Sequence, residues 1–403
     1  MKHPDRKKCR GYDLPGRCQR FTDLVYYGKA SDKDALKKEI FSIEEEYYPE
    51  KSPYNLYFGE IHGHSQLSDG FAEVTPEKYF HHLRYTAKLD FAALSDHDHG
   101  GIGNEPLFVP EKWKILQDAV KAAYAPGEFS TILAYERDSY PWYNNLVVYY
   151  RDHNGTPLLG ERAGEFTEAE LRHALGRNDI LLVPHDTGML NFGCDFNRIP
   201  LDLMPPLLQI VSRGGNAQEY FNHPLSRMDS CRGGFWQDAL TRGAIVGVIA
   251  SSDDHKCKGG VPDPELYPNT VLNAPDNLPC ITGVWAEENT TEAIFDALKA
   301  RRCYGFMGGR ISLDFRINGH FMGEVITLNK DEDRVIYWNC QCDSPIDKIT
   351  LVKNCRDDLI LRNSRGVIFD YSPELPVDCY YLRGITRDNR WCWSSPIWVR
   401  CKK

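Results

Sequence analysis

The chain repeats one pattern along most of its length: a short, almost entirely apolar run, then a turn, then an amphipathic segment. Apolar runs without alternation are typical of strands that are buried on both faces of a sheet. Strands that alternate with helices favour an α/β fold with a parallel sheet and outer helices, most simply a closed or nearly closed (β/α) barrel. An open doubly wound sheet is the alternative. The seven apolar runs are residues 55–62, 89–97, 130–136, 179–185, 206–212, 244–253 and 281–287, and the helical segments are 75–88, 109–127, 166–178 and 291–302.

Histidine and acidic residues lie at or just after the ends of five of these runs, and this placement indicates a catalytic or metal-binding site. In a parallel barrel the carboxyl ends of the strands meet at one face, where active sites are built. His62 and His64 are two residues apart, so they point to the same side of a strand. The turn at Asp69 returns a carboxylate toward them. The candidates at this face are His62, His64, Asp69, His97, Glu136, His185, Asp253 and His255.

Metal ions explain this set better than separate structural roles do. Each residue alone has an ordinary explanation, such as a helix cap or a surface ion pair. Burying so many carboxylates together costs several kcal/mol each unless cations compensate them. Imidazole mixed with carboxylate, without thiolate, suits Zn, Mn or Fe, and the number of ligands suits two or three ions with Glu136 as the bridge. Such sites activate water and hold a phosphoryl group, so we predict a hydrolase.

The order of these motifs resembles the PHP (polymerase and histidinol phosphatase) superfamily, and in particular its DUF3604 group. The resemblance extends from about residue 55 to the C-terminus. It is carried by "GEIHGHSQLSDG", "ALSDHDHG", "AYERDS", "VPHDTG", "IASSDDH", "RRCYGFMGGRISLDFRINGHFMGE" and "WCWSSPIWV". It implies a distorted seven-stranded (β/α) barrel, one to three divalent ions per chain and phosphoesterase activity.

The resemblance also implies which residues share an ion. The first ion would be held by His62, His64, Glu136 and Asp253, the second by Glu136 and His185, and the third by Asp69, His97 and His255. Asp96, Asp98 and Asp254 would orient the imidazoles from behind.

Two positions depart from the superfamily pattern. A further histidine is expected between Glu136 and His185, but the matching stretch is "PWYNNLVVYY", with Tyr143 or Asn144 at that position. Gln209 stands where related sequences commonly carry Glu. Because Tyr and Asn are poorer ligands than imidazole, we expect the ion shared by Glu136 and His185 to be held weakly or to be absent.

The predicted function is hydrolysis of a small-molecule or sugar-linked phosphate ester by metal-activated water. Glu136, His185 and Asp253 would be catalytic, with His185 or Asp253 relaying a proton. Arg213, in a glycine-rich turn, and Arg137 are the candidates for binding the substrate phosphate. A metal-dependent hydrolase of an amide or lactone bond and a catalytically degraded binding module are the alternatives.

The pattern changes near residue 311, where aromatic, alternating strands follow one another without helices. We therefore predict an N-terminal extension over 1–54, the barrel over 55–310 and a C-terminal β-sandwich over 311–403. The tryptophans of this last part, Trp391, Trp393 and Trp398, are expected in its core rather than on a binding surface.

Composition excludes several classes of partner. The net charge is -9, which argues against binding to nucleic acid or to an anionic membrane by bulk charge. No apolar run approaches the roughly 18 residues that a membrane span needs. The 13 cysteines are odd in number and scattered, which favours reduced thiols in a cytoplasmic protein over a disulfide framework. A homo-oligomer is compatible with these features.

Overall fold

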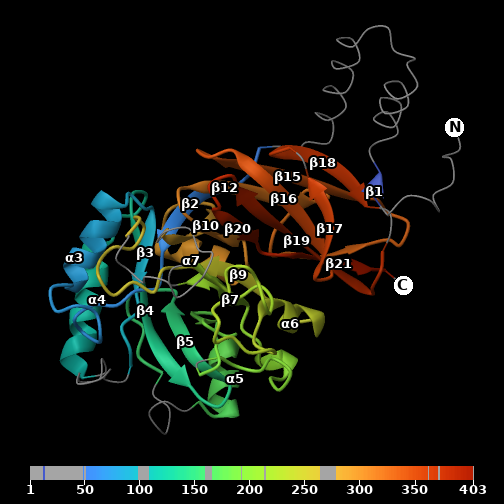
Figure 1. The fold of residues 1–403 in the computed structure, drawn as a ribbon. Coiled ribbons are helices and arrows are strands. Elements are labelled where there is room, and N and C mark those ends of the chain that lie inside the picture. The colour runs from blue at the N-terminus through green and yellow to red at the C-terminus, as the bar shows by residue number, and fades with distance from the viewer. Residues whose placement is uncertain are drawn as a thin grey trace, which may run out of the picture.

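The structure is a computed structural model of the 403-residue chain. Figure 1 shows two parts: a mixed part with the α-helices and a strand-rich C-terminal part. The residues that it describes are 12–13, 49, 51–98, 109–158, 166–191, 193–212, 215–263, 278–361, 363–370 and 373–402.

The first part of the chain combines strands with a few helices. Its strands are β2 (Asn55–Glu60), β3 (Phe91–Leu94), β4 (Ser130–Ser139), β5 (Tyr143–Tyr150), β6 (Ile180–Pro184), β7 (Leu207–Ser212), β8 (Asn216–Ala217), β9 (Gly247–Ala250), β10 (Cys280–Ala286) and β11 (Cys303–Met307). Its α-helices are α3 (Pro76–His81), α4 (Pro110–Ala123), α5 (Glu168–Gly176), α6 (Trp236–Thr241) and α7 (Thr291–Lys299). A π-helical turn (His82–Thr86) follows α3, and a 3-10 helix (Leu201–Leu203) precedes β7.

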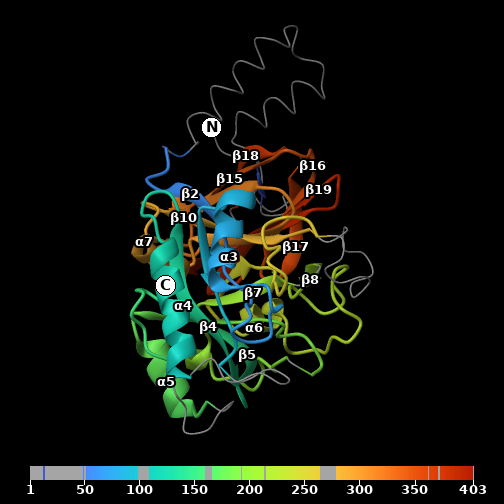
Figure 2. The same ribbon diagram turned by 90° about the vertical axis from the view of Figure 1, so that its left-hand side faces the viewer.

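All four predicted helices form, as α3, α4, α5 and α7, and local sequence signals define where two of them begin. The Thr75 side chain accepts a hydrogen bond from the Lys78 amide at the start of α3. Thr167 and Glu170 form a reciprocal capping box at the start of α5. Figure 2 shows α3 and α4 in front of the sheet that contains β3 and β4.

The prediction of an all-parallel sheet is wrong. β2, β3 and β4 are parallel, and so are β7 and β9, but β5 runs antiparallel to β4 and β6, and β10 runs antiparallel to β2 and β11. Residues 140–142 alone connect β4 to β5, and a link this short can only form a hairpin, because a parallel crossover needs about a dozen residues. The apolar stretch Leu146–Tyr150 was the sequence signal for β5.

The strands of the first part enclose a common apolar interior. One sheet runs β11-β10-β2-β3-β4-β5-β6 and another β8-β7-β9, so the ladders of the described strands do not join into one ring. The closed seven-stranded barrel therefore stays a prediction. Alternate residues of the strands nevertheless pack into one buried cluster, which includes Ile61, Phe91, Ile132, Val147, Tyr149, Val183, Leu207, Ile249 and Val284.

The C-terminal part consists of two sheets. Its strands are β12 (Ile311–Ile317), β13 (His320–Phe321), β14 (Val325–Leu328), β15 (Arg334–Cys342), β16 (Ile346–Lys353), β17 (Arg356–Leu361), β18 (Arg365–Asp370), β19 (Val377–Thr386), β20 (Trp391–Ser394) and β21 (Ile397–Cys401). One sheet is β1-β18-β15-β12-β13, in which β1 is Tyr12–Asp13. The other contains β14, β21, β19 and β20, and β20 pairs with β11. The second sheet is thus continuous with the first part of the chain.

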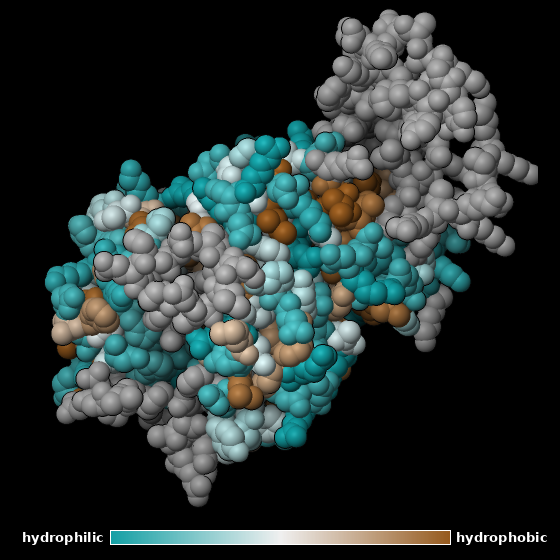
Figure 3. All heavy atoms as spheres, in the orientation of Figure 1, coloured by the Kyte–Doolittle hydropathy of each residue, from teal (hydrophilic) through white to brown (hydrophobic). Residues whose placement is uncertain are grey.

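The aromatic residues near the C-terminus lie in the interior, as predicted. Trp391, Trp393 and Trp398 are all buried, while the described surface visible in Figure 3 is largely hydrophilic. The cysteines in the described part of the chain are free thiols. Among the described helices, none combines the length and apolar character that crossing a membrane requires.

Candidate metal centre

The carboxyl end of β2 supplies two imidazoles to the interior. His62 and His64 are fully buried, with ring centroids 5.3 Å apart. The intervening Gly63 has no room for a side chain, because a Cβ there would lie 2.3 Å from the Tyr79 hydroxyl. The backbone is fixed across the site, where the His64 amide donates to the Asp254 carbonyl at 2.7 Å.

Four buried residues form an inner group. The Nε2 atom of His62 lies 3.0 Å from Glu136 Oε2 and 3.5 Å from Asp253 Oδ1. The Nε2 atom of His64 lies 3.2 Å and 3.0 Å from the same two oxygens. Each residue can direct one ligand atom to a common point, because these atoms lie within 4.8 Å of one another. The four residues are those that the resemblance to the PHP superfamily assigned to the first ion.

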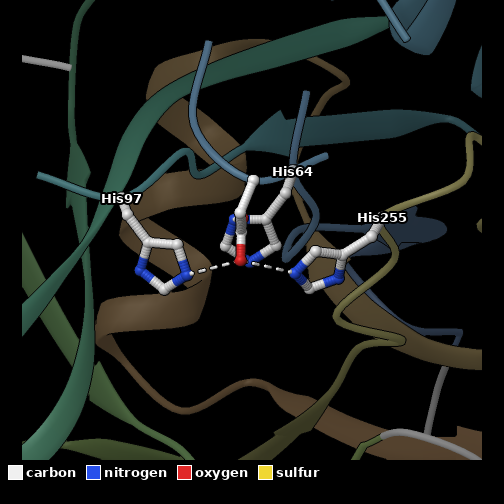
Figure 4. A group of neighbouring side chains, drawn as sticks. His64, His97 and His255 are labelled. Atoms are coloured by element: carbon white, nitrogen blue, oxygen red, sulfur yellow. Dashed lines mark hydrogen bonds and ion pairs between the residues drawn. The ribbon is translucent and has the colours of Figure 1, made fainter. Parts of the chain in front are cut away.

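A second set, the outer group, lies on the exposed side. His97 Nε2 and His255 Nε2 approach Asp69 Oδ2 at 3.4 Å and 3.2 Å, and His64 Nδ1 lies 3.4 Å from Asp69 Oδ1. Figure 4 shows the His97 and His255 rings on either side of a carboxylate oxygen, with His64 behind it. The Asp69 side chain is 34% exposed, whereas the inner carboxylates are at most 2% exposed. Among the described residues, the outer group is therefore the more exposed of the two.

A third set includes a residue that the sequence analysis did not propose as a ligand. His185 Nε2 lies 2.8 Å from Glu136 Oε1, and His185 also groups with Asp186 and Asp253. Asp186 and Asp253 both have positive φ, 50° and 53°, the left-handed conformation that Asp tolerates better than most residues. The only sequence signal for Asp186 was its place directly after His185 at a strand end.

Gln209 determines which nitrogen of His62 faces the carboxylates. Its amide nitrogen donates to the Ser251 carbonyl at 2.9 Å, so its oxygen faces His62 Nδ1, also at 2.9 Å. An oxygen can only accept, so His62 carries a proton on Nδ1. The Nε2 lone pair is then directed at Glu136 and Asp253, which are also acceptors. Such a cluster needs either an extra proton or a cation between its members.

The electrostatics support a cation at this place. Burial opposes the charged form of His62, but Asp253 and Glu136 outweigh it and raise the pKa to about 9. The pKa of His97 is raised in the same way, against burial, by Glu136 and Asp69, to about 10. Without an ion, protons on the imidazoles compensate the buried carboxylates. A divalent ion can replace those protons, because neutral imidazole and carboxylate are its ordinary ligands.

Two buried nitrogens point to the same conclusion. Within the described residues, the Nδ1 atoms of His64 and His185 make no hydrogen bond, although they lie 3.4 Å and 3.9 Å from carboxylate oxygens of Asp69 and Asp186. Buried polar atoms rarely lack a partner unless a water or an ion belongs there. The donor set therefore fits one or more divalent ions.

The two arginines proposed for phosphate binding have different outcomes. Arg137 follows Glu136 on β4, so its side chain lies on the opposite side of the strand. It is buried, donates to the Leu158 carbonyl and lies over the Phe166 ring, with 4.3 Å to its centroid. The structure thus places the Arg137 guanidinium among these partners and not beside the ligand groups, contrary to the prediction. Arg213 lies outside the described residues.

Tyr143 and Asn144, the residues at the first departure from the superfamily pattern, also turn away from the centre. The Tyr143 hydroxyl donates to the Leu203 carbonyl, and the Asn144 amide donates to the Gly193 carbonyl. Asn145, in contrast, shares its face of β5 with Val147 and Tyr149, which pack in the interior. Asn145, whose carbonyl accepts from the His185 amide, therefore holds the inward position that the sequence analysis assigned to Tyr143 or Asn144.

Two of the three aspartates that were expected to orient imidazoles, Asp96 and Asp254, accept hydrogen bonds from loop residues. Asp96 accepts from the Ser65 amide and from the Ser65 and Ser68 hydroxyls. Asp254 accepts from three backbone amides, those of residues 256, 258 and 259. These bonds fix the loops that carry His64 and His255. The amide of Asp98 donates to the Glu136 carbonyl.

Comparison with known proteins gives one family match and several distant relatives. A family model described as a protein of unknown function (DUF3604) matches residues 245–333. An uncharacterised protein of Chlamydia pneumoniae is 24% identical over 396 residues, which cover 91% of this chain and 61% of that protein. An uncharacterised protein of Chlamydia trachomatis is 23% identical with the same coverage. The chain thus spans 61% of the length of these curated relatives.

Among solved structures, the chain is similar to a two-domain protein of Bacteroides vulgatus that contains a predicted PHP-like metal-dependent phosphoesterase. The identity is 14% and the TM-score 0.44, with 87% of this chain and 97% of the other covered. The predicted resemblance to DUF3604 is confirmed over residues 245–333. The wider PHP relationship stays a prediction.

Proposed function

We propose that this protein is a metal-dependent phosphoesterase that hydrolyses a small-molecule or sugar-linked phosphate ester. The observation that carries the proposal is the sharing of residues between adjacent ligand groups. His64 belongs to the outer and inner groups, and Asp253 belongs to the inner group and the group of His185. Adjacent ions with shared ligands suit the displacement of one phosphate oxygen by another.

The residues have distinct roles in this proposal. His62, His64, Glu136 and Asp253 would hold the innermost ion, His185 with Asp186 a second, and Asp69, His97 and His255 the outermost. Zn, Mn or Fe would suit this mixture of nitrogen and oxygen ligands. When bound, such ions lower the pKa of a water ligand and neutralise the charge of a phosphoryl group.

The chain itself would orient the substrate and manage the proton. Glu136 directs one oxygen to His62 and His64 and the other to His185, so both sides of its carboxylate are oriented. Asp253 Oδ1 faces the imidazoles of His62 and His64, and the Asp253 carboxylate would accept a proton during the reaction. Lys256 follows His255, and its ammonium lies 5.6 Å from the centre of the Phe71 ring. We assign Lys256 the contact with the substrate phosphate that the sequence analysis gave to Arg137.

Metal analysis together with a phosphatase assay tests the proposal. The purified protein is examined by mass spectrometry for bound metal, and hydrolysis of an aryl phosphate is measured with added Mn or Zn. Asp253→Asn keeps the left-handed backbone but removes a charged ligand. It is expected to lower metal content and to reduce phosphate release by about 100-fold or more.

A matched variant controls for general effects on the fold. Asp314 is also a buried aspartate, but it pairs with Arg316 in the C-terminal part at 2.7 Å. Asp314→Asn should therefore keep metal and activity. Metal without phosphate release would refute the phosphoesterase proposal in favour of another hydrolase. A wild-type protein that binds no metal would refute the metal centre itself.

A further inference from the structure

A buried carboxylate links the C-terminal part to the loop that follows β7. Glu219 is fully buried, and three donors from β19 and β20 reach it. The Trp393 indole nitrogen donates to Oε2 at 2.7 Å, while the Tyr381 hydroxyl and Arg383 Nη1 reach Oε1 at 2.6 Å and 2.8 Å. Burial alone would raise the pKa of Glu219, but His223 and Arg383 lower it to about 2. Glu219 is therefore an ionised anchor held by the C-terminal sheet.

The same loop reaches the metal centre within three residues of Glu219. The side-chain nitrogen of Asn216 donates to Asp186 Oδ1 at 3.2 Å, and the Ser212 hydroxyl donates to the same oxygen at 2.8 Å. Gln218 Oε1 accepts from the Gly188 amide at 2.7 Å. The segment between β7 and α6 thus holds the Asp186 carboxylate and the backbone just after it.

β20 is itself fixed to the frame of the site. The Val248 amide of β9 donates to the Ser395 hydroxyl at 3.0 Å. A Cβ on Gly247 would lie 2.5 Å from that hydroxyl, so the two segments are in close contact. β20 is thus tied to β9, and Glu219 lies three residues after Asn216, which donates to Asp186, so a displacement of Glu219 would move a donor of Asp186.

We propose that the C-terminal part positions the His185 side of the metal centre, with Trp393 and Glu219 acting through Asp186. Trp393 is a positioning residue, because it touches neither a ligand nor the reacting atoms. The outer group does not depend on this connection, because its histidines come from the ends of β2 and β3 and from the loop after β9. The inference rests on the proposed metal centre but not on the bond that is hydrolysed.

Two matched tryptophan variants test the inference. Trp393→Phe removes the indole donor to Glu219 and keeps an aromatic ring. Trp391→Phe removes an equivalent donor, which bonds to Asn389 Oδ1 at 2.9 Å within the C-terminal part. Cobalt(II) is titrated into the metal-free proteins, and binding is followed by the absorption spectrum. We expect Trp393→Phe to bind one ion about tenfold more weakly, which is the lower end of the affinity loss seen when a residue that supports a metal ligand is replaced. We expect Trp391→Phe to bind cobalt as the wild type does.

A double variant separates positioning from a general loss of stability. Asp186→Asn should weaken the same ion, and Trp393→Phe should add no further loss in that background, because residues acting through one another are not additive. Equal cobalt binding by both tryptophan variants, or fully additive losses with Asp186→Asn, would overturn the inference.

Tyr381→Phe provides the test if Trp393→Phe does not fold, because it deletes only one hydroxyl that reaches Glu219. Weaker binding of the same ion supports the inference, and unchanged binding overturns it. Failure of the phosphoesterase proposal has a different signature, namely cobalt binding by the wild type without phosphate release. A wild-type protein that binds no cobalt overturns both.

Discussion

Replacing Gln209 by leucine tests whether this amide prepares His62 to bind a metal ion. The substitution conserves approximate size but removes the acceptor for His62 Nδ1 and the donor to the Ser251 carbonyl, two buried hydrogen bonds of 2.9 Å. Each partner left unsatisfied costs about 1–3 kcal/mol, so the free energy of unfolding of the metal-free protein should fall by at least about 2 kcal/mol. Denaturant titration measures this loss.

Metal affinity should fall as well, for a separate reason. Without the acceptor on Gln209, the imidazole can place its proton on Nε2, the atom that faces Glu136 and Asp253. Loss of such a supporting bond weakens metal binding by about 10–100-fold, which corresponds to about 1.4–2.8 kcal/mol of binding free energy. Isothermal titration of the metal-free protein with Mn or Zn measures this. Gln209→Glu, which keeps an acceptor, is expected to retain binding.

A buried amide at the other end of the strands provides the control. Asn289 is buried, and its side chain donates to the Asp90 carbonyl at 2.9 Å, just before β3. Asn289→Leu should destabilise the protein without changing its metal affinity. If Gln209→Leu binds metal as tightly as the wild type, the assignment of the His62 tautomer is refuted.

Three further predictions follow from the same geometry. Arg137→Met should lower the denaturation midpoint but leave the KM for an aryl phosphate unchanged; a raised KM would return Arg137 to the substrate site. Asn145→His should raise the number of ions bound per chain, measured by mass spectrometry, whereas Asn144→His should not. The reverse result would mean that Asn144, and not Asn145, faces the metal centre. The pKa values of His62 and His97 lie at about 9 and about 10, above the 6.5 of a free imidazole, so the folded state binds the extra protons. The two histidines therefore contribute fully to the free energy of unfolding below about pH 6.5, and this contribution is lost as the pH rises through about 9 to 10. Denaturant titrations of the metal-free protein measure this. Stability that rises over this pH range would contradict the reasoning.

The sequence predicted the residues of the candidate centre better than it predicted the sheet. His62 and His64 could be placed on one side of a strand because side-chain direction alternates along any strand. The caps at Thr75 and Thr167 defined helix starts through bonds within a few residues. In contrast, β5 was missed because its polar start looked like a loop, although the three residues before it allowed only a hairpin.

Other features depended on contacts between distant parts of the chain. Arg137 was expected at the mouth of the site because it directly follows the predicted ligand Glu136. Successive residues of a strand point to opposite faces, however, and Glu136 occupies the inward face. The part of Gln209 in orienting His62 required knowing that Ser251 lies on its other side. Asp186 could be recognised as a candidate ligand only from the structure, in which its left-handed backbone conformation places it in one group with His185 and Asp253.

The sequence by itself determined which side chains are available and which of them lie at strand ends, because residue type and strand periodicity are local properties. Only the tertiary structure decided which of them meet. His64 and Asp253 are 189 residues apart in the chain, yet their side chains lie 3.0 Å apart. The packing of β2 and β9 around a shared apolar interior produces that contact, whereas hydrogen bonds from Tyr381, Arg383 and Trp393 link Glu219 to the C-terminal sheet. Local sequence patterns predict neither the His64–Asp253 contact nor the bonds to Glu219, because both depend on the free energy of the whole folded chain.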